Sequence, residues 1–192
     1  SEKLKDDKNE FTKYLETISR QIVDIKKLVD EFSGFARMPS PILKKIDLLN
    51  VIKRSLDFYK ISHKDLNIEL NTNSNKKFFI KGDSDQLYRA FINLIKNSIE
   101  AIDEKKQKDS SLLGKINVEI DKNNEYIMIK MLDNGLGFGD TKSMLKPYYT
   151  TKKDGTGLGL PIVSKIINEH NGDIEFIKNS KGAEIKIYLP TI

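Results

Sequence analysis

Residues 150–160 read Thr-Thr-Lys-Lys-Asp-Gly-Thr-Gly-Leu-Gly-Leu, and they lead into a segment with the spacing of an amphipathic helix. Glycines at 155, 157 and 159 alternate with other residues, so the backbone there can turn tightly. Backbone N–H groups at the start of a helix form a cradle for an anion. Lys152 and Lys153 add positive charge beside that cradle. The stretch therefore predicts a phosphate-binding loop followed by a helix over 160–170.

Two common phosphate loops do not fit this stretch. A Walker A loop ends in Gly-Lys followed by Ser or Thr, and these glycines have no such continuation. A Rossmann fingerprint follows a strand directly, whereas no strand is predicted immediately before residue 150. The sequence thus indicates an anion cradle of another kind.

A second cluster, Asp133-Asn134-Gly135-Leu136-Gly137, directly follows a strand predicted over 125–132. A carboxylate at a strand end can accept a hydrogen bond from an exocyclic amine. Gly135 and Gly137 would let the backbone approach a flat ring closely. A plain Asp-Asn-Gly turn has the same sequence, so both interpretations remain open for this cluster.

A third cluster lies earlier in the chain, on a helix predicted to start at Asp83. Asn93 and Asn97 are four residues apart and therefore share one face of that helix. An amide oxygen is a hard, neutral ligand suited to Mg²⁺. The alternative is that both are ordinary polar positions. Glu100 is predicted to lie on a different face and to be structural or exposed.

The remaining pattern predicts the α/β class, with helices on one face of a mixed sheet, that is, a two-layer sandwich. Apolar residues at helical spacing predict a helix over 48–60, and alternation of apolar and polar residues predicts a hairpin of 115–121 with 125–132. Residues 134–157 are predicted to form a long mobile loop. Further strands are predicted over 67–71, 78–81, 173–178 and 183–189.

The first part of the chain predicts one long bundle helix. Its apolar residues recur at steps of four and three, as in a heptad repeat: Phe11, Leu15, Ile18, Ile22, Ile25, Val29 and Phe32. Met38-Pro39-Ser40-Pro41 cannot continue a helix. We therefore expect a helix over 1–38, a linker over 39–44 and a globular domain over 45–192. Such a stripe needs a partner helix, or it lies on the following domain.

The amino-acid composition excludes several classes of protein and of site. The 192 residues are 38% hydrophobic and 32% charged, which is compatible with a packed core. The sequence has no cysteine, so disulfides, zinc–cysteine sites, iron–sulfur clusters and thiol nucleophiles are excluded. No apolar stretch approaches the roughly 20 residues of a membrane span. The net charge of +5 comes from lysines interleaved with acids, which favours solvated lysines over a nucleic-acid partner.

Taken in order, the three clusters resemble the Bergerat-type ATP-binding domain of the GHKL superfamily, over about residues 46–189. That superfamily includes sensor histidine kinases, gyrase, MutL and heat-shock chaperone ATPases. The segment 93–101 is similar to its N box, and the segments 133–137 and 150–160 are similar to its two glycine boxes. The run Lys-Pro-Tyr-Tyr-Thr-Thr-Lys over 146–152 resembles the aromatic box of the lid.

Within the superfamily, the chain resembles sensor histidine kinases. Its first helix is similar to the second helix of their dimerisation and phosphoacceptor hairpin, and 30–39 resembles that junction in nitrogen-regulation kinases of NtrY or NtrB type. ATP-hydrolysing members carry a Glu four residues before the metal-binding Asn. Here that position is Asn93, which is not a useful base at neutral pH. The resemblance thus implies a site that holds ATP for transfer.

The resemblance implies a role for each matching position. Asn97 would ligate Mg²⁺ that bridges the phosphates, with Asn93 a weaker contact, and Asp133 would accept from the adenine amino group. Lys152 would approach the terminal phosphate. Asn97 and Lys152 are thus the implied catalytic residues, Asn97 is the metal ligand, and ATP and Mg²⁺ are the cofactors. The implied nucleotide-binding residues are Asn93, Asn97, Asp133, Gly135, Gly137, Lys152, Gly155, Thr156, Gly157, Leu158, Gly159 and Leu160.

The family's acceptor histidine has no counterpart here, because His63 is expected at the surface and His170 in a structural role. The chain is therefore expected to be a fragment that binds ATP or ADP without autophosphorylating. Its implied partners are its own phosphoacceptor helix, a response regulator receiver domain and a second copy in a homodimer. It would be the cytoplasmic portion of a bacterial, membrane-anchored sensor kinase. A pseudokinase or scaffold module and a serine kinase of the anti-sigma type are the alternatives.

Overall fold

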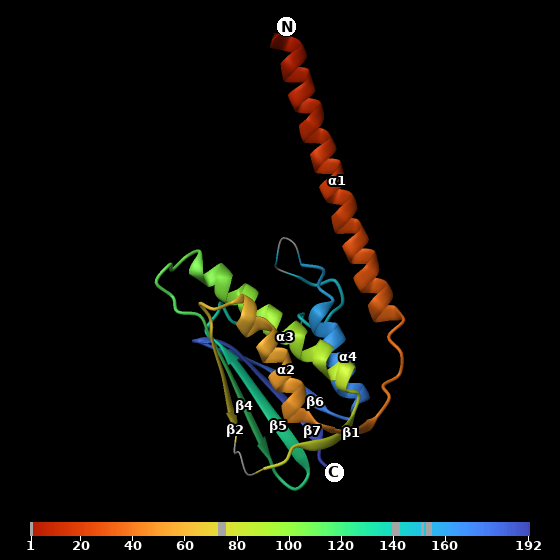
Figure 1. Cartoon of the computed structure of the whole chain (residues 1–192), viewed down its shortest axis with the longest axis vertical. Helices are drawn as coiled ribbons and strands as arrows, with labels where there is room; N and C mark the ends of the chain where they lie inside the picture. The colour runs from red at the N-terminus through yellow and green to blue at the C-terminus, as the bar shows by residue number, and fades with distance from the viewer. Residues whose placement is uncertain (1, 73–75, 140–142, 151, 153–154) are drawn as a thin grey trace. The chain divides into compact units, whose positions relative to one another are not determined.

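The computed structural model describes residues 2–72, 76–139, 143–150, 152 and 155–192, and the chain divides into two compact units. The first unit runs to Pro39 and the second from Ser40 to Ile192. Figure 1 labels the helices and most of the strands.

The first unit is one helix, α1, from Glu2 to Ala36. The seven apolar residues of the predicted heptad stripe all lie on it, and each is between 46% and 62% exposed. The helix ends just before the proline-containing segment, as the sequence predicts. Among the described residues, no helix is long and apolar enough to cross a bilayer. The stripe is therefore an exposed apolar surface of this unit.

The second unit contains a five-stranded sheet in the order β2-β4-β5-β7-β6 (Figure 1). Strand β2 pairs parallel with β4, and all other neighbours are antiparallel, so the sheet is mixed. The predicted hairpin is confirmed as the β4–β5 pair. The strand bounds are β2 Asn67–Thr72, β4 Lys115–Lys122, β5 Tyr126–Asp133, β6 Asp173–Asn179 and β7 Gly182–Pro190.

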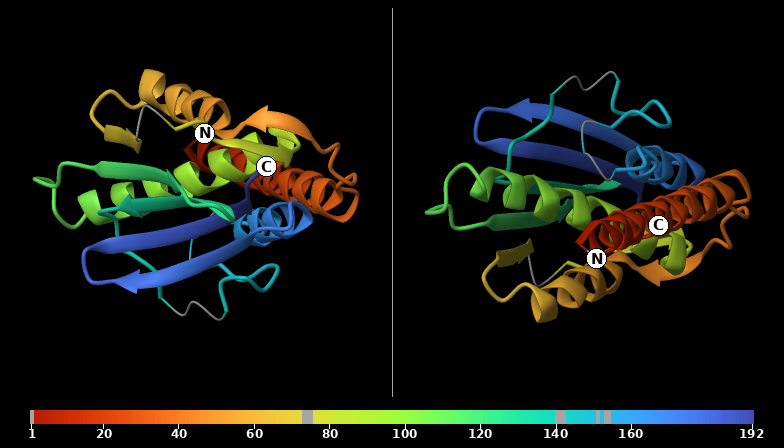
Figure 2. Two further views of the ribbon diagram at one scale, coloured as in Figure 1. Left: turned by 90° about the horizontal axis from the view of Figure 1, so that it is seen from below. Right: turned by 90° about the horizontal axis from the view of Figure 1, so that it is seen from above.

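Three helices pack on one face of this sheet: α2 Leu48–Ser62, α3 Ser84–Lys106 and α4 Gly159–Glu169 (Figures 1 and 2). Helix α3 is the central one, since it contacts both α2 and α4. Its buried face carries Leu87, Phe91, Leu94 and Ile95, and the sheet contributes alternate apolar residues from β4, β5 and β7. The predicted two-layer α/β sandwich, preceded by one long helix, is confirmed.

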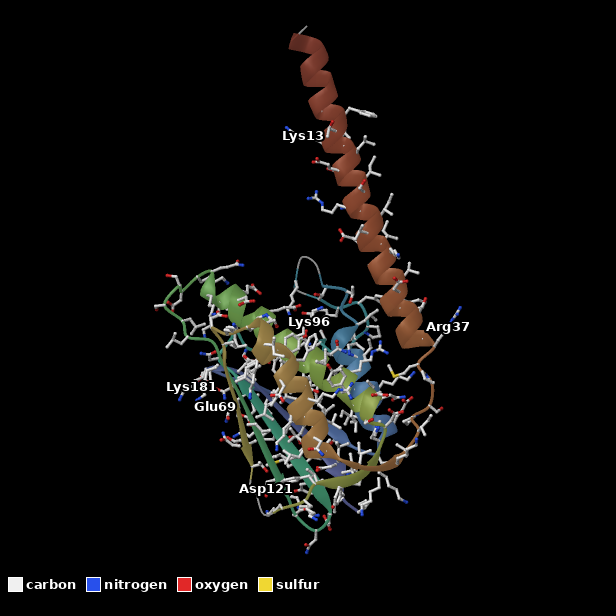
Figure 3. All side chains as sticks on the ribbon, viewed as in Figure 1. Lys13, Arg37, Glu69, Lys96, Asp121 and Lys181 are labelled. Carbon is white, nitrogen blue, oxygen red and sulfur yellow. The ribbon has the colours of Figure 1, made fainter. Side chains whose placement is uncertain are left out.

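The structure adds one small sheet that the sequence did not predict. Strand β1, Lys44–Asp47, pairs antiparallel with β3, Phe79–Gly82. The predicted linker ends at residue 44, which is the first residue of β1. Lys44 and Lys45 begin this strand, so its sequence has no alternation of apolar and polar residues that would predict it. Lys45 lies over the Phe79 ring at 4.7 Å, which is a cation–π contact. Charged side chains such as Glu69 and Asp121 lie outside the core (Figure 3).

Asp83 is the N-cap of α3, and it joins three segments. Its carboxylate accepts hydrogen bonds from the N–H groups of Asp85 and Gln86, and also from Ile42 at 3.0 Å. Its own N–H donates to Nε2 of the buried His170, at 2.9 Å. Burial alone would raise the pKa of Asp83, but the three N–H donors together hold that pKa below its ordinary value.

This network predicts a loss of stability in acid. Because the folded-state pKa of Asp83 is depressed, its contribution is fully present above the ordinary pKa of 3.8 and is lost as the pH falls through the lower folded-state value. Asp83→Asn removes that pH-dependent part, and Asp83→Ala also costs about 1 kcal/mol for the lost cap. Urea unfolding between about pH 2 and pH 7 measures both effects. Asp57→Asn, on the exposed side of α2, is the control. If the unfolding free energy of Asp83→Asn depends on pH as steeply as that of the wild type, this account is contradicted.

Candidate nucleotide-binding site

The last residue of β5, Asp133, is a buried carboxylate with only 9% exposure. One oxygen accepts from Ser98 Oγ at 2.7 Å, and the other accepts from the N–H groups of Gly135 at 2.9 Å and Ala183 at 3.2 Å. These donors come from α3, from the turn after β5 and from β7. A buried carboxylate is costly without such bonds. It offers about four acceptor positions, so three donors leave room for one more.

The turn after Asp133 is pressed against α3. A Cβ atom on Gly135 would lie 2.7 Å from the Ala101 carbonyl carbon, so only glycine fits there. Lys105 Nζ donates to the carbonyl oxygens of Asn134 at 2.8 Å and Gly135 at 3.0 Å. Gly137 has a φ of +77°, a conformation that favours glycine. The second cluster is therefore a fixed turn that α3 holds from one side.

The sequence analysis missed Gly182, which closes this turn from the other side. Gly182 starts β7, and a Cβ atom there would overlap the carbonyl oxygen of Asp133. A Cβ atom on Gly137 would in turn lie 2.7 Å from the Gly182 carbonyl oxygen. The only sequence signal was a glycine between two predicted strands. Its contact with Asp133 follows from the order β5-β7-β6, which the sequence did not provide.

Asn93 and Asn97 lie one turn apart on α3, and both are half-buried. A Cβ atom on Gly159, the first residue of α4, would lie 3.8 Å from Asn97 Nδ2. The amide cluster and the start of α4 are thus neighbours. Leu158, at the N-cap of α4, is fully buried and is apolar, so its side chain cannot cap the helix. The N–H groups of this first turn remain suited to an anion.

The glycine-rich run folds back on the residues before it. The Gly157 carbonyl oxygen accepts from the Tyr148 N–H at 3.2 Å, and Gly157 itself has a φ of +68°. The N–H of Gly155 donates to the Lys152 carbonyl oxygen at 3.3 Å. Thr156 and Leu160 are half-buried. The other residues of the predicted cradle, namely Thr151, Lys153 and Asp154, lie outside the described residues.

The interpretation of Glu100 as a residue on another face is wrong. Glu100 follows Asn97 by three residues, which places both on the same stripe of α3. Its carboxylate forms an ion pair with Lys152 Nζ from the glycine-rich run. Burial raises the pKa of Tyr59 on α2, and the charge of Glu100 raises it further. The three-residue spacing from Asn97 already indicates a shared face, but the ion pair could not be predicted because Lys152 is 52 residues away in the sequence.

Both histidines have contacts within the second unit. His170 is buried, and its Nδ1 lies 2.7 Å from the Ile166 carbonyl oxygen while Nε2 accepts from Asp83. These partners assign the ring proton to Nδ1. His63 packs against the Tyr59 ring, with centroids 5.7 Å apart.

The residues fit Mg²⁺ that arrives with a phosphate ligand. Within the part of the chain that the structure describes, no group of three or more His, Cys, Asp or Glu side chains could hold a metal ion by itself. Mg²⁺ commonly takes one or two protein ligands and completes its shell with water and substrate phosphates. The half-buried Asn97 amide, beside the start of α4, has the donor chemistry for such an ion.

Comparison with known proteins agrees with this geometry. Residues 82–192 match the family described as histidine kinase-, DNA gyrase B- and HSP90-like ATPases. The chain therefore belongs to this ATPase family.

The relatives that the chain resembles include a nitrogen regulation protein and NtrY-like proteins described as putative sensor histidine kinases. It is 35% identical over 187 residues to the nitrogen regulation protein NtrY of Azorhizobium caulinodans, covering 95% of this chain and 24% of that protein. It is 33% identical over 184 residues to a putative NtrY-like sensor histidine kinase of Rickettsia typhi, covering 94% of this chain and 30% of that protein. The chain thus spans less than a third of the length of these two relatives.

Solved structures share the fold. Full-length ShkA in complex with AMPPNP superposes with a TM-score of 0.72, covering 91% of this chain and 38% of that chain. The sequence identity is 19%, so this likeness concerns the fold. The family match and the relatives identify the second unit as a histidine kinase-like ATPase domain of the kind found in sensor kinases.

The contact between Gly182 and Asp133 gives a prediction with a matched control. Gly182→Ala should displace the Asp133 backbone or the start of β7, and it should cost about 1–3 kcal/mol of unfolding free energy, as overpacking does. Gly139→Ala adds the same methyl group where nothing lies within 4 Å, so it should be neutral. Chemical denaturation of the two variants measures the difference. Equal stability of both would contradict the close packing around Asp133.

Proposed function

We propose that the second unit binds ATP with Mg²⁺ and supplies the γ-phosphoryl group to a histidine of a sensor kinase, for relay to an aspartate of a response regulator. One observation carries the proposal. Asp133 is buried at the end of β5, is held by three donors and keeps capacity for a fourth. An adenine amino group is a donor that fits this acceptor. The family and the sensor-kinase relatives support the same assignment.

The other site residues bind different parts of the nucleotide. Gly135 and Gly137 shape the base pocket, because their lack of a side chain brings the turn close to the ring. The N–H groups at the start of α4 bind the phosphates. Gly155 and Gly157 precede this helix and Gly159 is its first residue, so their backbone can approach the phosphates closely. Asn97 is the ligand for Mg²⁺, with Asn93 as a weaker contact, and Mg²⁺ would neutralise phosphate charge. Lys152 approaches the terminal phosphate.

The arrangement favours transfer of the phosphoryl group over hydrolysis. Phosphoryl transfer depends mainly on positioning and on charge neutralisation. Hydrolysis also needs a base to activate water, and the position four residues before Asn97 is occupied by an amide, Asn93. We infer that the acceptor histidine lies outside this chain, since His170 is held by Ile166 and Asp83 and His63 packs against Tyr59.

The proposal extends to the longer protein. The exposed apolar stripe of α1 supports its role as the second helix of a hairpin, with the phosphoacceptor helix and a second copy of the protein as partners. The relatives' names support a bacterial sensor kinase, of which this chain would be the cytoplasmic portion beyond a membrane anchor. A nucleotide-binding pseudokinase or scaffold is the alternative. A full-length protein that binds ATP but never acquires an acid-labile phosphate would favour that alternative.

Nucleotide binding should stabilise the wild-type chain but not a variant without the Asp133 carboxylate. A ligand at about 100 times its dissociation constant adds roughly 2.7 kcal/mol, which raises the midpoint of thermal unfolding by several degrees. We expect this shift for Mg²⁺ with ADP or with AMPPNP in the wild type. Asp133→Ala and Asp133→Asn should both lose it.

Asp103→Ala is the control for this experiment, because Asp103 is an exposed carboxylate on α3. It should retain the full shift. Only the difference with and without ligand is compared, since Asp133→Ala also leaves three donors without their acceptor. An undiminished ligand shift in both Asp133 variants would refute the proposed base pocket.

A further inference from the structure

Glu100 occupies a position that the proposed mechanism leaves unexplained. It lies on the same stripe of α3 as Asn93 and Asn97, at steps of four and three residues. Its carboxylate is paired with Lys152 Nζ, and the two side chains are 38% and 32% exposed. Lys96 Nζ lies 3.8 Å from the other carboxylate oxygen. Figure 3 labels Lys96 on α3.

This pairing places an anion beside the proposed phosphate position. Lys152 is the cation that the proposed function assigns to the terminal phosphate, and without nucleotide it is already neutralised by Glu100. A nucleotide would bring several further negative charges to Asn97, three residues from Glu100. Two anions would then compete for one ammonium group. Both side chains are partly exposed, so the competition is set by modest energies and by salt.

We propose that Glu100 is a competing counter-ion that holds Lys152 in the nucleotide-free chain and releases it to the terminal phosphates. It is a positioning residue, because it acts on the nucleotide through Lys152. This inference rests on the proposed nucleotide site. It adds Glu100 as a group that tunes the affinity of that site for the phosphates of the nucleotide.

The charge change gives the effect a direction. Glu100→Gln removes the competing anion but keeps the size of the side chain, so Lys152 becomes available to the phosphates. We expect about threefold tighter binding of Mg²⁺-ADP and Mg²⁺-AMPPNP, the effect of one partly exposed ion pair. Adenosine has no phosphate, so its affinity should stay unchanged. A purely structural role of Glu100 would instead weaken binding of all three ligands.

A second comparison separates competition from simple repulsion. If Glu100 acts through Lys152, Glu100→Gln should give little or no gain in a chain that already carries Lys152→Gln. If Glu100 only repels the phosphates through space, the gain should be the same in both backgrounds. Glu104→Gln is the matched control, since it makes the same charge change at an exposed site one turn further along α3.

The experiment is calorimetric titration of the whole chain with adenosine, Mg²⁺-ADP and Mg²⁺-AMPPNP, for the wild type, Glu100→Gln, Lys152→Gln, the double variant and Glu104→Gln. A gain for the two phosphorylated ligands that vanishes in the Lys152→Gln background supports the proposal. A gain that persists there, a gain for adenosine, an equal gain in Glu104→Gln, or no gain at all overturns it while leaving the nucleotide site intact. Failure of the wild type to bind any of the three ligands overturns the proposed function as well.

Discussion

The structure of the second unit depends on one constraint, the satisfaction of the buried Asp133 carboxylate. Burying this charge would be prohibitive if it were isolated, so the chain supplies donors from three directions. Ser98 contributes a hydroxyl from α3, Gly135 an N–H from the following turn, and Ala183 an N–H from β7. The helix layer, the turn and the sheet must therefore meet at one point. That point is also where the proposed adenine pocket lies.

The glycines around Asp133 are a consequence of this convergence. Helix α3 approaches the turn so closely that Gly135 has no room for a Cβ atom, and β7 approaches so closely that Gly182 has none either. By contrast, Gly139 lies in open space. Glycine thus has two uses in this chain. At 135 and 182 it permits close packing, whereas at 137 and 157 it also provides a backbone conformation that other residues rarely adopt.

Periodicity and turn residues were enough to predict most of the fold. The alternating pattern of β4, the apolar run of β5 and the buried face of α3 are strong local signals for these elements. Strand β1 was missed because its sequence, Lys-Lys-Ile-Asp, has almost no apolar face. Asp133 could be singled out because a carboxylate at a strand end before two glycines is typical of a binding turn. Asn93 and Asn97 could be singled out because a spacing of four residues places two amides on one helix face. Their roles in nucleotide binding remain proposals.

Other features of the candidate site depend on long-range contacts that a local pattern cannot contain. Gly182 reaches Asp133 only because β7 lies next to β5 in the sheet. The hydroxyl of Ser98 donates to Asp133, which is 35 residues away in the sequence, so no local pattern indicates this contact. Glu100 is predicted from the sequence to be structural or exposed on another face, whereas in the structure it pairs with Lys152 from the glycine-rich run. In each case, the missing information was which elements are neighbours in space.

The central claim is that Asp133 accepts a hydrogen bond from the amino group of adenine. Competitive titration with Mg²⁺-ADP and Mg²⁺-inosine diphosphate tests it most directly, because inosine carries a carbonyl oxygen where adenine carries the amino group. Placing the carbonyl oxygen of inosine against the Asp133 carboxylate costs about 1–3 kcal/mol in a buried site, so inosine diphosphate should bind roughly 5- to 150-fold more weakly. Equal affinity for the two nucleotides would contradict the claim, since the base would then not be recognised through the Asp133 carboxylate.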